Sequence, residues 1–241
     1  MKKLFNLKKE NRHELYTYKY PKSTLAEAYR TLRTNLGFAC VDDECRSILF
    51  TSPNPGDGKS TVASNLAVVM AQAGNRVALV DADLRKPMQH TIFEVDNRQG
   101  LTSVLLRETE TKKVMHNGLV ENLHVMTSGP IPPNPAEILS SARTRQLLEQ
   151  LLAEYDYVFI DAPPLLAVTD ASLLSTIVDG VVLVVAYAAT RNDLARESVE
   201  QLRKANARII GVVLNQVKVE SGDYKYYYYY YSHSDEAHKT N

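Results

Sequence analysis

The sequence has little of what would point to a membrane span, a nucleic-acid partner or a secretory route. Its most apolar run, residues 180–189, is half the length of the ~20 residues that cross a bilayer. Lysine plus arginine and aspartate plus glutamate number 28 each, so the zero net charge gives no support for binding nucleic acid or an anionic membrane. The basic N-terminus has no uninterrupted apolar segment, so we expect no secretory signal.

Cysteine is almost absent, and this excludes a disulfide framework. Cys40 and Cys45 are the only two, and the four residues between them match no common redox or metal-binding pair. We expect both to be reduced thiols in a cytosolic protein. The same spacing disfavours an ATPase that scaffolds metal clusters, which would need paired cysteines.

The sequence does contain an alternation of apolar, strand-like segments with helical ones along most of its 241 residues. Several of the strand-like segments are continuous apolar runs, which are typical of a parallel sheet covered by helices on both faces. We predict an α/β fold, in which a mostly parallel β-sheet is flanked by helices. Strands are expected at 47–52, 76–83, 122–129, 155–164, 179–187 and 207–215, and the clearest helices at 24–39, 60–73 and 193–205.

Three segments are expected along the chain. Residues 1–22 form a basic N-terminal arm, residues 23–219 form a single domain, and residues 220–241 form a tail. A capping-box pattern, Thr24 with Glu27 three residues later, is expected to open the first helix of the domain.

A phosphate-binding loop is predicted at 51–61, between an expected strand and an expected helix. From Pro53 the segment reads P-x-x-x-x-G-K-S, a P-loop pattern with proline where the first glycine is usual. Gly56 and Gly58 allow the backbone to turn its N–H groups toward phosphate oxygens. The positive end of the following helix dipole favours the same anion.

The side chains that follow these glycines suit a nucleotide triphosphate with its metal. Lys59 supplies a positive charge for the β and γ phosphates, and the Ser60 hydroxyl is placed to ligate Mg²⁺. The sequence therefore predicts ATP and Mg²⁺ as cofactors. The residues expected to bind ATP in this loop are Gly56, Asp57, Gly58, Lys59, Ser60 and Thr61.

Three aspartates follow other expected strands. Asp81 and Asp83 come after one apolar strand, and Asp161 ends another. Ligands gather at the carboxyl ends of parallel strands, so these carboxylates should converge beside the P-loop. They would repel one another unless a proton or a divalent cation intervened, and Mg²⁺ bound with ATP meets that need. A nearby carboxylate could also take the proton of an attacking phenol.

The tail contains a run of tyrosines. Tyrosine favours β-strands, so the run could be a strand packed on the domain. It does not alternate with polar residues, however, and its flanks are polar, so we expect an exposed, flexible tail. The predicted phosphate acceptors in this run are Tyr224, Tyr226, Tyr227, Tyr228, Tyr229, Tyr230 and Tyr231.

Together these motifs resemble the bacterial tyrosine kinases of capsule and exopolysaccharide synthesis, in the short form whose membrane partner is a separate chain. The resemblance extends from about Pro21 to the C-terminus. It depends on the P-loop SPNPGDGKS, a second motif LVDADLRKP, a Walker B motif VFIDAPP, the segment GPIPPNPAE, the tyrosine tail and an ExxRxxR element.

The resemblance assigns roles within the predicted site. It implies that Lys59 binds phosphates and that Asp161 holds Mg²⁺ together with Ser60. Asp81 would be either the general base or a water-mediated metal contact, with Asp83 as its partner. Two further ATP contacts are implied: Thr61 near the α-phosphate, and Asn215, at the end of the last strand, on the adenine.

Glu27, Arg30 and Arg33 make up the ExxRxxR element and share roughly one face of the first helix. From spacing alone this is a solvated face with one weak ion pair. The resemblance implies instead a surface for homo-oligomerisation into a ring, in which each subunit offers its tail to a neighbour.

The resemblance also implies partners and a setting. A transmembrane activator of the polysaccharide co-polymerase type would recruit the cytoplasmic chain to the inner face of the membrane, and a cognate tyrosine phosphatase would reverse its autophosphorylation. The pathway controlled would be capsular or exopolysaccharide synthesis and export. The alternative is a partition or division-site ATPase, but Asn54 stands where those proteins carry an early P-loop lysine.

Overall fold

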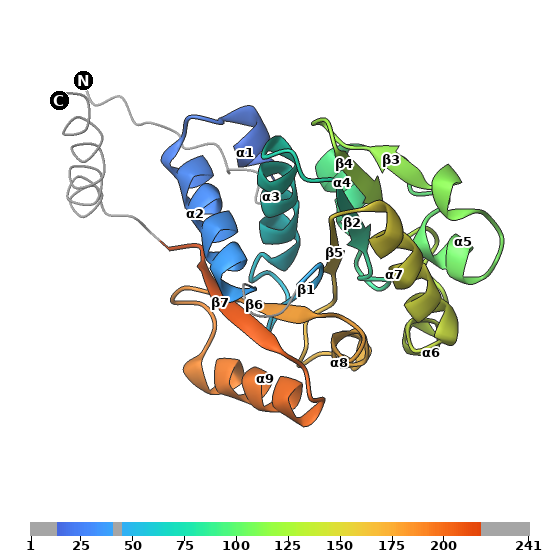
Figure 1. Cartoon of the computed structure of the whole chain (residues 1–241). Coiled ribbons are helices and arrows are strands. Elements are labelled where there is room, and N and C mark those ends of the chain that lie inside the picture. Colours follow the sequence, from blue (N-terminus) through green and yellow to red (C-terminus); the bar gives the residue numbers. More distant parts are fainter. Residues whose placement is uncertain (1–13, 41–44, 218–241) are drawn as a thin grey trace, which may run out of the picture.

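A seven-stranded sheet lies between two layers of helices in the computed structural model, which describes residues 14–40 and 45–217 (Figure 1). The strand order is β3-β4-β2-β5-β1-β6-β7, and every neighbouring pair is parallel except β3 with β4. The strands are β1 Ser47–Thr51, β2 Val77–Asp81, β3 Met115–Asn117, β4 Leu123–Met126, β5 Tyr157–Asp161, β6 Gly180–Ala186 and β7 Ile209–Asn215. This confirms the predicted α/β fold.

The helices divide between the two faces of the sheet. One buried cluster joins that sheet to the side chains of α2, α3 and α4, and a second joins it to α5 through α9. The helices are α1 Tyr16–Lys19, α2 Thr24–Ala39, α3 Lys59–Gln72, α4 Gln89–Phe93, α5 Leu101–Leu105, α6 Pro135–Leu139, α7 Ala142–Glu154, α8 Asp170–Ser175 and α9 Asn192–Lys204. A single 3₁₀ turn spans Thr111–Lys113. No helix in the described part of the chain is long and apolar enough to cross a membrane.

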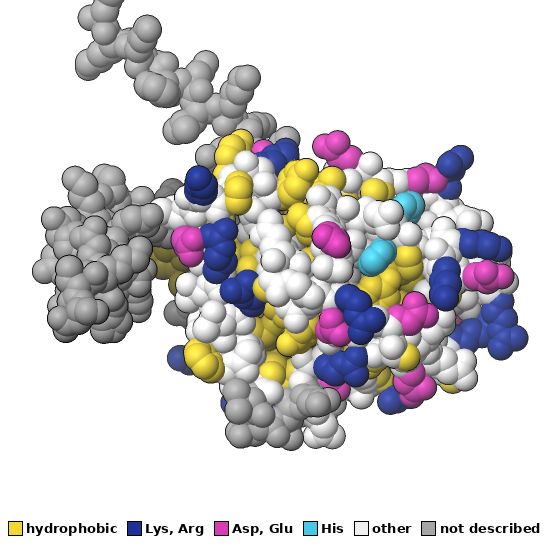
Figure 2. Space-filling model, turned by 45° about the horizontal axis from the view of Figure 1, so that its top comes forward, with side chains coloured by type: hydrophobic (Ala, Val, Ile, Leu, Met, Phe, Trp, Pro, Cys, Tyr) yellow, Lys and Arg dark blue, Asp and Glu magenta, His cyan; other side chains and the backbone are white. Residues whose placement is uncertain are grey.

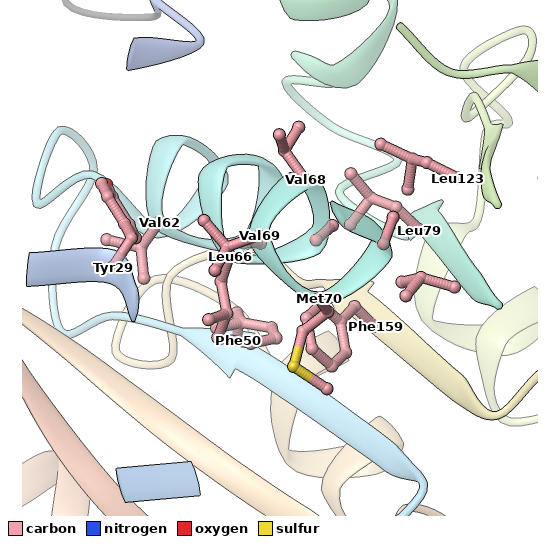
Figure 3. Packing of buried hydrophobic residues seen from close by; sticks show 14 of the residues in the cluster. Tyr29, Phe50, Val62, Leu66, Val68, Val69, Met70, Leu79, Leu123 and Phe159 are labelled. Atoms are coloured by element: carbon pink, nitrogen blue, oxygen red, sulfur yellow. The ribbon is translucent and has the colours of Figure 1, made fainter. Parts of the chain in front are cut away.

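The central strands are apolar because both of their faces are covered. All five residues of β1 and of β2 are buried. Phe50 and Phe159, from the neighbouring strands β1 and β5, pack edge to face with ring centroids 5.1 Å apart, below Leu66 of α3 (Figure 3). Such aromatic pairs add to the stability that burial of apolar area provides. This packing fixes β1 and α3, and therefore the loop between them.

Several local predictions needed correction. The pattern missed β3, because three residues at the sheet edge are too short to show a period of two. It also missed the short helices α1, α4, α5 and α8. The cap of α2 is Ser23 and not Thr24: the Ser23 hydroxyl accepts a hydrogen bond from Ala26 N at 3.2 Å, whereas Glu27 pairs with Arg30.

The described part of the expected N-terminal arm, residues 14–22, contains the short helix α1, which packs against α3. Leu15 and Thr17 are buried there. The backbone N–H of Thr17 donates to Oδ1 of Asn65 at 3.0 Å, and the Asn65 amide donates to Glu14 O at 3.1 Å. The division of the chain into arm, domain and tail stays a prediction, since residues 1–13 and 218–241 lie outside the described residues. The predicted tyrosine acceptors are among them.

Candidate active site

The P-loop joins β1 to α3 in a conformation that only glycine adopts readily. Gly56 has φ +88° and Gly58 has φ +96°, both in the left-handed region. Gly58 is the N-cap of α3, and Lys59 is the first residue of that helix. The positive end of a 14-residue helix therefore faces the space beside the loop. The predicted strand–loop–helix arrangement of a phosphate site is present.

Side chains from other parts of the chain hold this loop from outside. The Asp57 carboxylate accepts hydrogen bonds from Asn54 N at 2.9 Å and from the Thr190 hydroxyl at 2.8 Å. The Asn215 amide donates to Asp57 O at 2.9 Å, and the Gln216 amide donates to Gly56 O at 2.7 Å. These hydrogen bonds fix the outer side of the loop.

Lys59 lies among the aspartates predicted for the site. Its Nζ atom is 2.9 Å from Asp83 Oδ2, 3.1 Å from Asp161 Oδ1 and 3.1 Å from Ser60 Oγ. Burial alone would lower the pKa of the Lys59 ammonium, but the Asp161 and Asp83 carboxylates outweigh burial and raise it. The structure thus brings together residues that are 102 positions apart in the sequence.

Asp81 is fully buried at the end of β2, directly opposite Asp161 in the register of β5. Its Oδ2 atom accepts the backbone N–H groups of Met88 at 2.9 Å and Gln89 at 2.8 Å, and its Oδ1 atom accepts that of Asp83 at 3.2 Å. Burial first, and then the charge of Asp161, raises the pKa of Asp81 to about 8. A carboxyl group with a pKa near the working pH is suited to proton transfer.

The donor set fits Mg²⁺ bound with a nucleotide. Ser60 Oγ and Asp161 Oδ1 both contact Lys59 Nζ, so oxygen ligands already converge on one cationic group. Over residues 14–40 and 45–217, no three His, Cys, Asp or Glu side chains are grouped so that they could hold a metal by themselves. Nucleotide-bound Mg²⁺ does not require such a cage, because phosphates and water supply most of its ligands.

The other predicted residues have distinct positions. Thr61 follows Ser60 in the first turn of α3, and Asn215 lies over the P-loop through its bond to Asp57 O. The ExxRxxR residues are apart from the carboxylates, on α2. There Arg30 pairs with Glu27 and donates to Pro21 O at 2.6 Å. Arg33 is directed toward α3, 3.5 Å from Val69 O.

Sequence patterns did not point to several residues of this site. Gln89 is fully buried and donates to Asp161 Oδ2 at 2.8 Å, although a single amide side chain gives no signal in the sequence. Thr190 and Gln216 contact the P-loop from far along the chain. Arg85 forms a bidentate ion pair with the buried Asp170, at 2.9 and 3.0 Å. This pair fixes the loop after β2 against α8.

Changing Gly58 to alanine should weaken nucleotide binding more than changing Gly56. A Cβ atom at Gly58 would lie 2.0 Å from Asn215 Nδ2, so Asn215 would have to move and lose its bond to Asp57 O. A Cβ at Gly56 meets nothing within 4 Å, and that variant bears only the cost of a left-handed backbone. Calorimetric titration with ADP should show a loss of affinity about tenfold greater for Gly58→Ala than for Gly56→Ala, as the loss of one hydrogen bond predicts. Equal losses of ADP affinity in the two variants would contradict the proposed role of the Asn215 contact.

Comparison with known proteins agrees with this geometry. A family model described as "ParA: NUBPL iron-transfer P-loop NTPase" matches residues 45–240. Tyrosine-protein kinase YwqD from Bacillus subtilis (strain 168) is 47% identical over 207 residues, which cover 86% of this chain and 87% of the relative. The chain belongs to the bacterial tyrosine kinases. Putative tyrosine-protein kinase CapB from Staphylococcus aureus is 37% identical over 219 residues, with 91% of this chain and 96% of CapB covered.

Solved structures place the chain in the same kinase family. The chimerical protein CapA2B2 superposes with a TM-score of 0.82 at 42% identity, covering 85% of this chain and 90% of that one. The kinase domain of Escherichia coli ETK gives a TM-score of 0.80 at 34% identity, with 86% and 83% covered. The septum site-determining protein MinD from Pyrococcus horikoshii is 24% identical with a TM-score of 0.63, and shares the fold. In longer relatives such as EpsB from Ralstonia nicotianae, the match spans 28% of the relative.

Proposed function

We propose that this tyrosine kinase transfers the γ-phosphoryl group of ATP to the C-terminal tyrosine cluster of a neighbouring subunit. The observation that carries the proposal is the position of Lys59, between Asp83 and Asp161 at the start of the P-loop helix. A cation and carboxylates at a phosphate-binding loop are the parts that phosphoryl transfer requires. Mg²⁺, when bound with ATP, would neutralise phosphate charge. Ser60 would hold it, Asp161 would hold it directly or through water, and any contact from Asp81 would be through water.

The transfer step needs a proton acceptor. The phenol oxygen forms a bond to the γ-phosphorus while the bond from that phosphorus to the β,γ-bridging oxygen breaks, and ADP leaves. The phenol proton passes to Asp81, with Asp83 as its partner. The raised pKa of Asp81, about 8, supports this assignment, because the Asp81 carboxylate is then a stronger base than an ordinary aspartate. Asn215 would contact the adenine and Thr61 the α-phosphate.

The place where the described chain ends supports the tail as the acceptor. The last described residue, Val217, follows β7, whose final residue Asn215 contacts the P-loop. A tail that continues from Val217 would therefore start at the nucleotide edge of the sheet. About ten extended residues reach on the order of 33 Å, which is enough to cross between subunits. We assign self-association to Glu27, Arg30 and Arg33 of α2; the exposed Glu27–Arg30 pair could re-form across an interface.

Tail phosphorylation would act as a switch on this assembly. Each phosphate adds about −1.5 to −2 charges, so several of them on adjacent tyrosines repel one another and the acidic site of a neighbour. The kinase would work in capsular or exopolysaccharide synthesis and export, in the cytoplasm at the inner face of the membrane. A transmembrane activator would recruit it and a tyrosine phosphatase would reset it.

Incubation with ATP and Mg²⁺, followed by phosphotyrosine mapping and light scattering, tests the proposal. We expect phosphotyrosine on the tail and a fall in assembly mass as phosphate accumulates. A matched sample with ADP in place of ATP should keep its mass. ATP hydrolysis without phosphotyrosine would instead support a positioning ATPase, and an unchanged assembly after full phosphorylation would contradict the switch.

A further inference from the structure

Gln89 connects the three motifs that build the active site. It is the first residue of α4, and none of its surface is exposed. Its side-chain Nε2 donates to Asp161 Oδ2 at 2.8 Å, and its Oε1 accepts from the Ser64 hydroxyl of α3 at 2.7 Å. Its backbone N–H donates to Asp81 Oδ2 at 2.8 Å. One residue therefore bonds to the ends of β2 and β5 and to the P-loop helix.

The chemistry of its partners fixes the orientation of the Gln89 amide. An ionised Asp161 carboxylate can only accept hydrogen bonds, so the NH₂ group of Gln89 must face it. The reversed amide would place two oxygens 2.8 Å apart. The Gln89 oxygen then faces Ser64, whose single proton is shared between Gln89 Oε1 and Ser60 O, at 2.7 and 2.6 Å. A buried amide with one allowed orientation is a rigid support.

The hydrogen bond from Gln89 gives the two carboxylate oxygens of Asp161 different surroundings. Oδ2 is occupied by Gln89, while Oδ1 is directed to the Lys59 side, where Ser60 also lies. We propose that Gln89 is a positioning residue, which holds the Asp161 carboxylate so that Oδ1 faces the metal and phosphates. Gln89 is fully buried, so we assign its effect to the bond with Asp161. The inference depends on the proposed role of Asp161 in metal binding. Groups that orient a metal-binding side chain commonly change metal affinity or activity by 10- to 100-fold when they are lost.

The experiment measures how much Mg²⁺ strengthens ADP binding, by calorimetry with Mg²⁺ and with EDTA. Gln89→Met keeps the length of the side chain and removes its N–H donors. We expect the gain in ADP affinity from Mg²⁺ to fall by about 10- to 100-fold in this variant. ADP affinity in EDTA should stay close to the wild-type value, because the P-loop is unchanged. A loss that is equal with and without Mg²⁺ would mean a purely structural role, and would overturn the proposal.

Two further variants sharpen this test. Ser64→Ala removes the contact to Gln89 Oε1 and leaves the bond to Asp161, so the effect of Mg²⁺ should stay near wild type. Gln89→Asn keeps the amide and draws it back from Asp161 by one methylene. If Gln89→Met does not fold, Gln89→Asn provides the same measurement and should also lose the effect of Mg²⁺. A wild-type response to Mg²⁺ in either Gln89 variant that folds would refute the inference.

The proposed function can fail separately from this inference. Wild-type protein that binds Mg²⁺ and ADP together but forms no phosphotyrosine would contradict the kinase proposal for the tail. The role of Gln89 would still be judged by how its variants change the increase in ADP affinity that Mg²⁺ gives. Wild-type protein that showed no gain from Mg²⁺ would contradict the assigned metal role of Asp161, and with it the positioning role of Gln89.

Discussion

Replacing Lys59 with methionine should abolish phosphotyrosine on this chain. The Lys59 ammonium is buried between Asp83 Oδ2 and Asp161 Oδ1, at 2.9 and 3.1 Å, beside the loop that would bind the phosphates. Methionine fills similar space without the charge. Loss of one preorganised group that stabilises transition-state charge commonly costs on the order of 100-fold or more in rate. Anti-phosphotyrosine detection over a time course with ATP and Mg²⁺ would measure this.

A matched substitution separates this effect from a general loss of positive charge. Lys112 is exposed in the 3₁₀ turn near β3, where no predicted site residue lies, so Lys112→Met should autophosphorylate at the wild-type rate. Circular dichroism should show that both variants are folded. If phosphotyrosine persisted in Lys59→Met at more than a trace, the P-loop assigned here would not be the source of the phosphoryl group.

Replacing all seven tail tyrosines with phenylalanine should remove most of the phosphotyrosine signal while ADP binding stays intact. Phenylalanine differs from tyrosine only by the hydroxyl oxygen that accepts the phosphoryl group, so ring size and apolar character are kept. Mass spectrometry of tryptic peptides would quantify the loss, and calorimetry would check the nucleotide site. The tail lies outside the described residues, so this test depends on chemistry and not on any contact of the tail.

The control for the tail is a tyrosine on the surface of the domain. Tyr187 is 50% exposed after β6, and Tyr187→Phe should leave the signal unchanged. A signal that survived the loss of the tail tyrosines would place the acceptors elsewhere. Tyr18 and Tyr20, at 43% and 52% exposure near α1, would then be the first residues to map.

The sequence predicted the site where its residues carry their own local signal. The P-loop stands out because a Gly-rich turn, Lys59 and Ser60 follow an apolar strand and start a helix. Asp81 and Asp161 stand out because each ends an apolar strand, and parallel topology then brings those ends together. Short elements such as β3 and α4 gave no signal, because their few residues are too short for a period to appear.

Amide contacts could not be predicted in the same way. Gln89, Asn215 and Gln216 hold the carboxylate and the loop through single hydrogen bonds, whose partners are far away in the sequence. An amide side chain has no charge and no periodic pattern to indicate its partner. The pairing of Arg85 with Asp170 was hidden for a similar reason, since the two residues are 85 positions apart.

The sequence by itself determined the fold class, the P-loop and the identity of the charged site residues. Hydrophobic patterns and turns depend on residues that are close together in the sequence. Only the tertiary structure decided which oxygen of Asp161 faces Lys59, which carboxylates pair with Lys59, and which side chains hold the P-loop from outside. Those answers depend on the order β2-β5-β1 of the strands and on the packing of α3 and α4 over them. Contacts between distant segments form only when the strands have assembled into the sheet, so local patterns cannot specify them.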